Sequence, residues 1–168
     1  MGYFPLCVDL KGKRVLLVGD GPQIADKIEK LRPFGAVLVR CETITPEMLD
    51  QQTAFVVVGD TSFDIAKQIS SLCASKHIPV NVVDRPSLST FFFPALISRG
   101  DVTVSVSTGG KSPGTAAYLA GKIGQQIPSD LGQIVDQLQA LRKQLYASYP
   151  KETARRLLRE AAERAFED

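Results

Sequence analysis

Asp84 is placed for acid–base chemistry. It follows the apolar run 78–83, which predicts a strand, and it precedes a loop at 85–94 that is rich in proline and aromatic residues. A carboxylate at the carboxyl end of a strand, among apolar neighbours, suits a residue that accepts or donates a proton. The residues alone fit an aspartate that caps a turn or a helix at least as well.

A second candidate is the turn Gly19-Asp20-Gly21, which joins the apolar strand 15–18 to a helix opened by Pro22. Two glycines in this context allow a tight turn and a close approach of the backbone to a pyrophosphate at the helix N-terminus. Ile24 stands where the motif has a third small residue, which should loosen the helix–strand packing, and Asp20 adds negative charge. A tight turn without a ligand is the alternative.

Two further segments belong to the same expected strand edge. Glu42 follows the second strand about 20 residues after the glycines, where an acidic residue bonds the ribose hydroxyls of NAD. An ordinary solvated glutamate is the alternative, and Arg14 or Arg40 would instead favour the 2′-phosphate of NADP. The segment Gly59-Asp60-Thr61 ends the third strand and either lines a cofactor or forms a plain turn.

The segment 108–112, Thr-Gly-Gly-Lys-Ser, precedes a predicted helix. It is not a P-loop, because the leading glycine of that motif would fall at Ser105. Its hydroxyl and backbone N–H groups at a helix start suit a carboxylate or a phosphate, and Lys111 adds positive charge.

The elements that must position these residues alternate between apolar strands and amphipathic helices. This alternation predicts an α/β fold with a parallel sheet covered on both faces. Residues 84–101 are interpreted as a crossover out of the first domain, and the alternating run 102–106 as a half-exposed strand. The strands are predicted at 15–18, 37–41, 54–58 and 78–83, and the later helices at 116–125, 131–145 and 151–167.

Composition excludes several classes of protein. A formal charge of +2 without a dense basic run argues against nucleic acid, and the apolar runs are too short to cross a bilayer. Three separated cysteines in apolar surroundings predict buried free thiols, and the one histidine, His77, predicts a surface residue with no metal site. The N-terminus lacks the pattern of a signal peptide, so we expect a cytoplasmic protein without a membrane partner.

Several blocks in one order give a stronger signal than any single residue. The chain closely resembles the precorrin-2 dehydrogenase / sirohydrochlorin ferrochelatase family of sirohaem synthesis over nearly its whole length. The blocks that carry the resemblance are Tyr3-Phe4-Pro5-Leu6, Asn81-Val82-Val83-Asp84-x-Pro86, Phe91-x-x-Pro94-Ala95, Arg99-Gly100 and Ser107-Thr108-Gly109-Gly110-x-Ser112-Pro113.

The resemblance implies an NAD-binding Rossmann-like domain at 1–83, a dimerisation and substrate-binding region at 84–126 and a C-terminal helical region at 127–168. It implies a homodimer that oxidises precorrin-2 to sirohydrochlorin with NAD and, in bifunctional members, inserts ferrous iron. A descendant that binds, transfers or metallates a tetrapyrrole without dehydrogenation is the alternative.

The resemblance also assigns roles to residues, with Asp84 as the essential catalytic aspartate. The candidate cofactor-binding residues are Gly19, Gly21, Pro22, Gln23, Glu42, Thr43, Gly59 and Thr61. The candidate residues for the polyanionic tetrapyrrole are Asn81, Phe93, Pro94, Thr108, Gly109, Gly110, Lys111 and Ser112. The chain departs from the family on the cofactor side: at Asp20, at Ile24, at 58–61 and in a shortened segment between Cys41 and Ala54.

Overall fold

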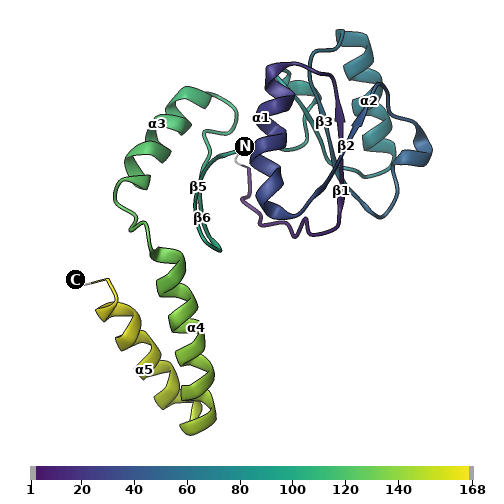
Figure 1. Cartoon of the computed structure of the whole chain (residues 1–168). Coiled ribbons are helices and arrows are strands. Elements are labelled where there is room, and N and C mark those ends of the chain that lie inside the picture. The colour runs from purple at the N-terminus through teal and green to yellow at the C-terminus, as the bar shows by residue number, and fades with distance from the viewer. Residues whose placement is uncertain (1–2, 167–168) are drawn as a thin grey trace. The chain divides into compact units, whose positions relative to one another are not determined.

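The computed structural model describes residues 3–166, which form two compact units divided between Phe93 and Pro94. The first unit contains a four-stranded parallel sheet in the order β2-β1-β3-β4 (Figure 1). Its strands are β1 (Arg14–Val18), β2 (Val37–Cys41), β3 (Thr53–Val58) and β4 (Val80–Val82). The chain leaves β1 for β2 on one side and returns to β3 on the other, so the strand order reverses beside β1.

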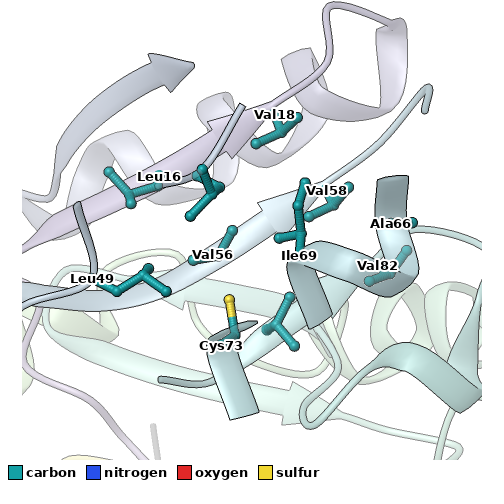
Figure 2. Packing of buried hydrophobic residues seen from close by; sticks show 11 residues of the cluster. Leu16, Val18, Leu49, Val56, Val58, Ala66, Ile69, Cys73 and Val82 are labelled. Carbon is teal, nitrogen blue, oxygen red and sulfur yellow. The ribbon is translucent and has the colours of Figure 1, made fainter. Parts of the chain in front are cut away.

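Both faces of this sheet are buried, which explains why the strands are continuous apolar runs rather than alternating ones. Successive residues of β1 and β3 point to opposite faces and enter two separate hydrophobic clusters. Leu16 and Val56 pack with Ile69 and Cys73 on one face, as Figure 2 shows. Val15, Leu17 and Val57 pack with Ile24 and Leu31 on the other face.

Two helices supply the covering layers. Helix α1 (Pro22–Leu31) begins with proline at its first position, where a missing N–H has no consequence, and Ile24 and Leu31 are its buried residues. Helix α2 (Phe63–Ser75) begins after Ser62, whose hydroxyl accepts a hydrogen bond from the Ile65 N–H. Three short 3-10 helices complete the unit: η1 (Arg32–Phe34), η2 (Pro46–Met48) and η3 (Pro86–Leu88).

The second unit consists of a hairpin and three helices (Figure 1). Strands β5 (Ala95–Arg99) and β6 (Val102–Val106) pair antiparallel. They are followed by α3 (Pro113–Gly124), α4 (Leu131–Ser148) and α5 (Lys151–Arg164), and α5 runs back along α4. Gly100 and Gly132 allow the hairpin turn to approach the start of α4, because a carbon added to Gly100 would lie 2.9 Å from the Gly132 Cα.

The structure confirms the predicted α/β fold, including the parallel sheet and the C-terminal helices. Within the predicted crossover 84–101 it shows η3 and strand β5, which were not predicted from the sequence. The pair Gly100-Asp101 between two apolar runs was the hairpin signal that the sequence offered. Strand β4 is also shorter than the predicted 78–83, and Pro79, just before it, has no N–H to donate to a ladder.

Two smaller expectations have separate outcomes. The three cysteines are free, but only Cys73 is buried; Cys41 is half-buried and Cys7 is exposed, so the prediction of three buried thiols was wrong. His77 is exposed, as expected for a surface histidine. No helix within residues 3–166 is both long and apolar enough to cross a membrane.

Candidate functional site

A cavity lies at the carboxyl edge of the sheet, where the strand order reverses. Open α/β sheets bind ligands at this position because the loops after neighbouring strands diverge there. The cavity holds about 350 Å³, within the range of small-molecule sites. We call it the sheet-edge cavity; it is lined by Val18, Gly19 and Asp20 after β1, by Arg40, Cys41 and Glu42 at the end of β2, and by Asp60 and Thr61 after β3.

The loop after β1 has the backbone that its glycines predict. Gly19 adopts φ +101°, a conformation that side chains disfavour, and a carbon added to it would overlap the Gly59 carbonyl. The Gly59 N–H donates to the Val18 carbonyl at 2.9 Å, which joins the ends of β1 and β3. Gly21 is the N-cap of α1, and no side chain caps this helix. The loop therefore brings its backbone to an uncapped helix N-terminus.

The space in front of Gly21 is filled by this chain's own carboxylate. A side-chain carbon at Gly21 would overlap the Oδ2 atom of Asp60. Asp60 follows β3 in the left-handed backbone conformation, with φ +49°, and is exposed. Asp60 belongs to the segment 59–61 that was expected either to line a cofactor or to form a plain turn, and only Gly59 and Thr61 of that segment were assigned as cofactor-binding residues. The missing side chain of Gly21 thus leaves space that the Asp60 carboxylate occupies.

Ile24 does not loosen the helix–strand packing, contrary to the expectation from its size. Its side chain is fully buried, and a carbon added to Gly59 would lie 3.1 Å from both Ile24 Cδ1 and Cγ1. The missing side chain of Gly59 therefore accommodates the larger side chain of Ile24. Two of the departures from the family pattern compensate for each other.

The charges around the sheet-edge cavity are mostly negative. Asp20, Glu42 and Asp60 supply three carboxylates, and Arg40 supplies the one guanidinium among the lining residues. The Arg40 Nη1 atom lies 3.1 Å from Asp20 Oδ1, so its charge is engaged. Thr43, one residue beyond the lining, is exposed.

Arg14 lies away from the cavity, so the suggestion that it contacts a 2′-phosphate was wrong. It opens β1 at the opposite edge of the sheet and forms an ion pair with Asp50. Its hydrogen bond holds the pKa of the Asp50 carboxyl below the ordinary value. Two cations remain beside the candidate cofactor residues: Arg40, and Arg85, whose guanidinium donates to the Thr61 and Ser62 carbonyls at 2.9 and 3.0 Å.

Asp84 lies at the same edge, one strand beyond the cavity. It follows β4 with φ +59°, and its Oδ2 atom accepts a hydrogen bond of 2.6 Å from the Gln23 side-chain amide. Gln23 lies in the first turn of α1, so the glycine loop and Asp84 are linked through one helix turn. The expected apolar surroundings do not enclose Asp84, which is exposed.

Two other candidates of the first unit have structural contacts. Asn81 is 6% exposed, and its side-chain amide donates to the Phe91 carbonyl at 3.0 Å. Phe93 packs against Phe55 and Phe91, with centroid distances of 6.0 and 5.3 Å. Both contacts fix the loop after Asp84 to the sheet.

The candidate turn 108–112 belongs to the second unit. The Thr108 hydroxyl donates to the Ser112 carbonyl at 3.0 Å and accepts from the Ser112 N–H at 3.1 Å, which closes the turn. The Ser112 hydroxyl accepts from the Thr115 N–H and caps α3. Gly109 and Gly110 adopt positive φ, and Lys111 is exposed. Pro94, the remaining substrate candidate, is half-buried. The turn is rigid, and Lys111 is its exposed charge.

The sequence indicated the edge of the sheet and missed the contacts across it. The link from Gln23 to Asp84 joins residues 61 positions apart, and the contact of Asp60 with Gly21 depends on a left-handed backbone after β3. The presence of an aspartate directly after the third strand was the sequence feature that could have indicated the contact between Asp60 and Gly21. No cluster of three potential metal ligands occurs among residues 3–166.

Comparisons with known proteins agree with this geometry. Siroheme synthase of Thioalkalivibrio sulfidiphilus is 32% identical over 177 residues, which cover 93% of this chain and 36% of the relative. Siroheme synthase of Thiobacillus denitrificans is 32% identical over 155 residues, covering 80% of this chain and 32% of the relative. The chain thus spans about a third of the length of these relatives.

A solved structure of a precorrin-2 dehydrogenase, SirC, has the same fold. Its TM-score is 0.68 at 21% sequence identity, with 94% of this chain and 88% of that chain covered. A sequence model of the family described as "Putative NAD(P)-binding" matches residues 6–95. This match takes in the glycine loop, the sheet-edge cavity and Asp84, and it extends over more than half of the 168 residues. The chain belongs to this NAD(P)-binding family.

Proposed function

We propose that the chain oxidises precorrin-2 to sirohydrochlorin with NAD in sirohaem synthesis. The observation that carries the proposal is the 2.6 Å hydrogen bond between Asp84 and Gln23. It puts a carboxylate beside the first turn of the helix that the glycine loop opens. A proton acceptor and a dinucleotide loop at one sheet edge are what a nicotinamide-dependent dehydrogenation requires.

The residues of the sheet-edge cavity fit a dinucleotide in most respects. The glycine loop would hold the pyrophosphate, Glu42 would accept hydrogen bonds from the adenosine ribose, and Thr61 would line the path toward β3. Three carboxylates against one engaged arginine disfavour a 2′-phosphate, so we propose NAD rather than NADP. When bound, the nicotinamide supplies the hydride acceptor that side chains lack.

Asp84 would act on the substrate. The oxidation removes two electrons and two hydrogens from precorrin-2: one leaves as hydride to the nicotinamide and the other as a proton. Asp84 would accept this proton and, being exposed, release it to water. The Gln23 amide donates to Asp84 Oδ2 and so would orient the carboxylate toward the substrate.

The substrate carries several carboxylates, which need cationic or N–H partners. In the second unit, the closed turn 108–112 with exposed Lys111 at the start of α3 suits such groups. We also propose a cytoplasmic homodimer. The exposed apolar side chains Phe4 and Leu6 near the N-terminus, 88% and 77% exposed, are typical of surfaces covered by a second chain.

A second candidate function is tetrapyrrole binding, transfer or metallation with ferrous iron, without dehydrogenation. Asp60 favours it, because this carboxylate stands where the pyrophosphate of NAD would rest. The two candidates differ in whether NAD binds and is reduced.

One experiment separates them. Purified protein is mixed with anaerobically prepared precorrin-2 and NAD, and NADH is followed by its absorbance while sirohydrochlorin is followed by its own spectrum. We expect both to form in equal amounts. Absence of NADH at saturating NAD, together with insertion of added ferrous iron into sirohydrochlorin, would replace the first candidate with the second.

A further inference from the structure

We infer that Asp60 is an affinity-determining residue of the cofactor site: its carboxylate occupies the pyrophosphate position in the free protein, and the dinucleotide binds by displacing it. This inference rests on the proposed NAD site at the glycine loop. Asp60 would lower the affinity for NAD, whereas a cofactor-binding residue raises it.

The geometry places the carboxylate in the space that the motif reserves for the ligand. The second glycine of a dinucleotide loop lacks a side chain so that the pyrophosphate can approach the backbone. In this chain Asp60 Oδ2 fills the position of the absent Gly21 side chain. Gly21 is also the N-cap of α1, whose first turn contains no acidic residue. A carboxylate from β3 therefore takes the place of an anion at this helix N-terminus.

The electrostatics make this position unfavourable for a second anion. Among the residues that the structure describes, the Asp60 carboxylate has no ion-pair partner. The one cation that lines the cavity, Arg40, is paired with Asp20 at 3.1 Å. The Arg85 guanidinium donates to the Thr61 and Ser62 carbonyls just after Asp60, but it forms no ion pair with the Asp60 carboxylate. A pyrophosphate that entered beside Asp60 would therefore meet a like charge.

The surroundings of Asp60 allow displacement. The residue is exposed, and it follows β3 rather than lying within the strand. Its φ of +49° is a conformation that aspartate tolerates and that glycine or asparagine adopts with less strain. Rotation of the side chain away from Gly21 opens the loop without moving the sheet. The cost of that rotation and of the remaining repulsion sets the affinity for NAD.

The test measures NAD binding by calorimetry for the wild type and three variants. Asp60→Asn removes the charge and keeps the size, and Asp60→Gly removes both; each suits a positive φ. Asp64→Asn is the matched control, because it removes an exposed carboxylate four positions away in the first turn of α2, outside the cavity lining. Thermal melting of each protein reports the stability of the fold.

We expect both Asp60 variants to bind NAD about fivefold more tightly or better, the effect of one like charge at about 4 Å in water. Their melting temperatures reflect two opposing effects, the loss of an anion from a helix N-terminus and the relief of strain at a positive φ, so the affinity alone decides the inference. Asp64→Asn should leave the affinity unchanged. A gain in affinity cannot arise from partial unfolding, so this result is specific.

The inference is overturned if both Asp60 variants bind NAD as the wild type does, or more weakly. In that case a lower melting temperature would identify Asp60 as a structural cap alone. Turnover of precorrin-2 decides the proposed function separately. Tighter NAD binding by the Asp60 variants without turnover of precorrin-2 would support the role of Asp60 and contradict the proposed dehydrogenase activity. Turnover of precorrin-2 with unchanged NAD affinity in the Asp60 variants would support the dehydrogenase activity and contradict the role of Asp60. Failure of all four proteins to bind NAD would overturn both.

Discussion

The ends of β3 and β4 use the same residue in the same backbone conformation for different purposes. Asp60 follows β3 with φ +49°, Asp84 follows β4 with φ +59°, and both are exposed at one edge of the sheet. The carboxylate of Asp60 faces Gly21, whereas that of Asp84 accepts a hydrogen bond from Gln23. Both partners lie at the start of α1. The partners of the two carboxylates thus lie within the same first turn of α1, two positions apart.

The two aspartates share their residue type and backbone conformation and differ in the neighbour that each carboxylate meets. In both cases the aspartate side chain reaches the first turn of α1. Next to Gly21, the Asp60 carboxylate enters the space that a side chain would fill. Next to an amide donor, the Asp84 carboxylate is fixed and available. The same substitution at the two positions should therefore have different consequences.

Asp84→Asn should give the largest effect. The amide keeps the size and tolerates the positive φ but cannot accept the proton, so kcat for precorrin-2 oxidation should fall by about 10²- to 10⁴-fold. The dissociation constant for NAD, measured by calorimetry, should stay within about twofold. This contrasts with Asp60→Asn, which should alter NAD binding. Wild-type kcat in Asp84→Asn would remove Asp84 from the chemistry and end the comparison.

Gly59→Ala tests the packing that supports the end of β3. The added carbon would lie 3.1 Å from two atoms of Ile24, which is fully buried and has little room to move. We expect a loss of about 1 to 3 kcal/mol in the free energy of unfolding, measured by denaturant titration.

The control for Gly59→Ala is the double variant with Ile24→Val, which removes the Cδ1 atom. If the two sites are complementary, the double variant should be more stable than the sum of the single effects by about 0.5 kcal/mol or more. Strict additivity would show that Ile24 and Gly59 do not compensate for each other, and that the loop after β3 adjusts freely.

Local patterns predicted most of the fold. Strands 15–18 and 37–41 and the helix opened by Pro22 followed from apolar runs and proline placement, because these signals act within a few residues. Strand β5 was missed because its partner is β6 and its own pattern is interrupted by exposed Ser98. A hairpin prediction needs both strands and the turn together.

The candidate site was predictable only as a set of strand ends. Parallel topology brings the residues after β1, β2 and β3 to one edge, which the order of elements implies. It does not specify which side chain crosses to a neighbouring loop. Gln23 was predicted to bind the cofactor, yet its side-chain amide contacts Asp84. The negative charge beside Gly21 arises because the Asp60 side chain points toward this glycine.

Gln23→Ala should have a moderate effect that decides between these two roles. Loss of an amide donor to an exposed carboxylate should lower kcat about three- to tenfold, with KM for NAD unchanged. Gln23→Glu should lower kcat further, because it sets a like charge beside Asp84. A rise in KM for NAD with kcat unchanged would restore the predicted cofactor role of Gln23 and contradict its role in positioning Asp84.

The smallest effect concerns the cysteine at the end of β2, and it reports on the cavity directly. Cys41 lines the sheet-edge cavity and is half-buried, and burial raises the pKa of its thiol. Burial raises the pKa of Cys73 to about 11, whereas Cys7 is exposed. Since the thiolate is the reactive form, alkylation at pH 8 should modify Cys7 first, Cys41 slowly and Cys73 least.

NAD should slow the alkylation of Cys41 a few-fold and leave that of Cys7 unchanged, as followed by peptide mass spectrometry. In Asp60→Asn the same protection should appear at a lower NAD concentration, whereas in Asp84→Asn it should appear at the wild-type concentration. Equal shifts in the two variants would mean that both carboxylates face the cofactor alike. Different shifts would assign the effect on NAD to the end of β3, because Cys41 senses the cavity while Asp84 lies one strand beyond it.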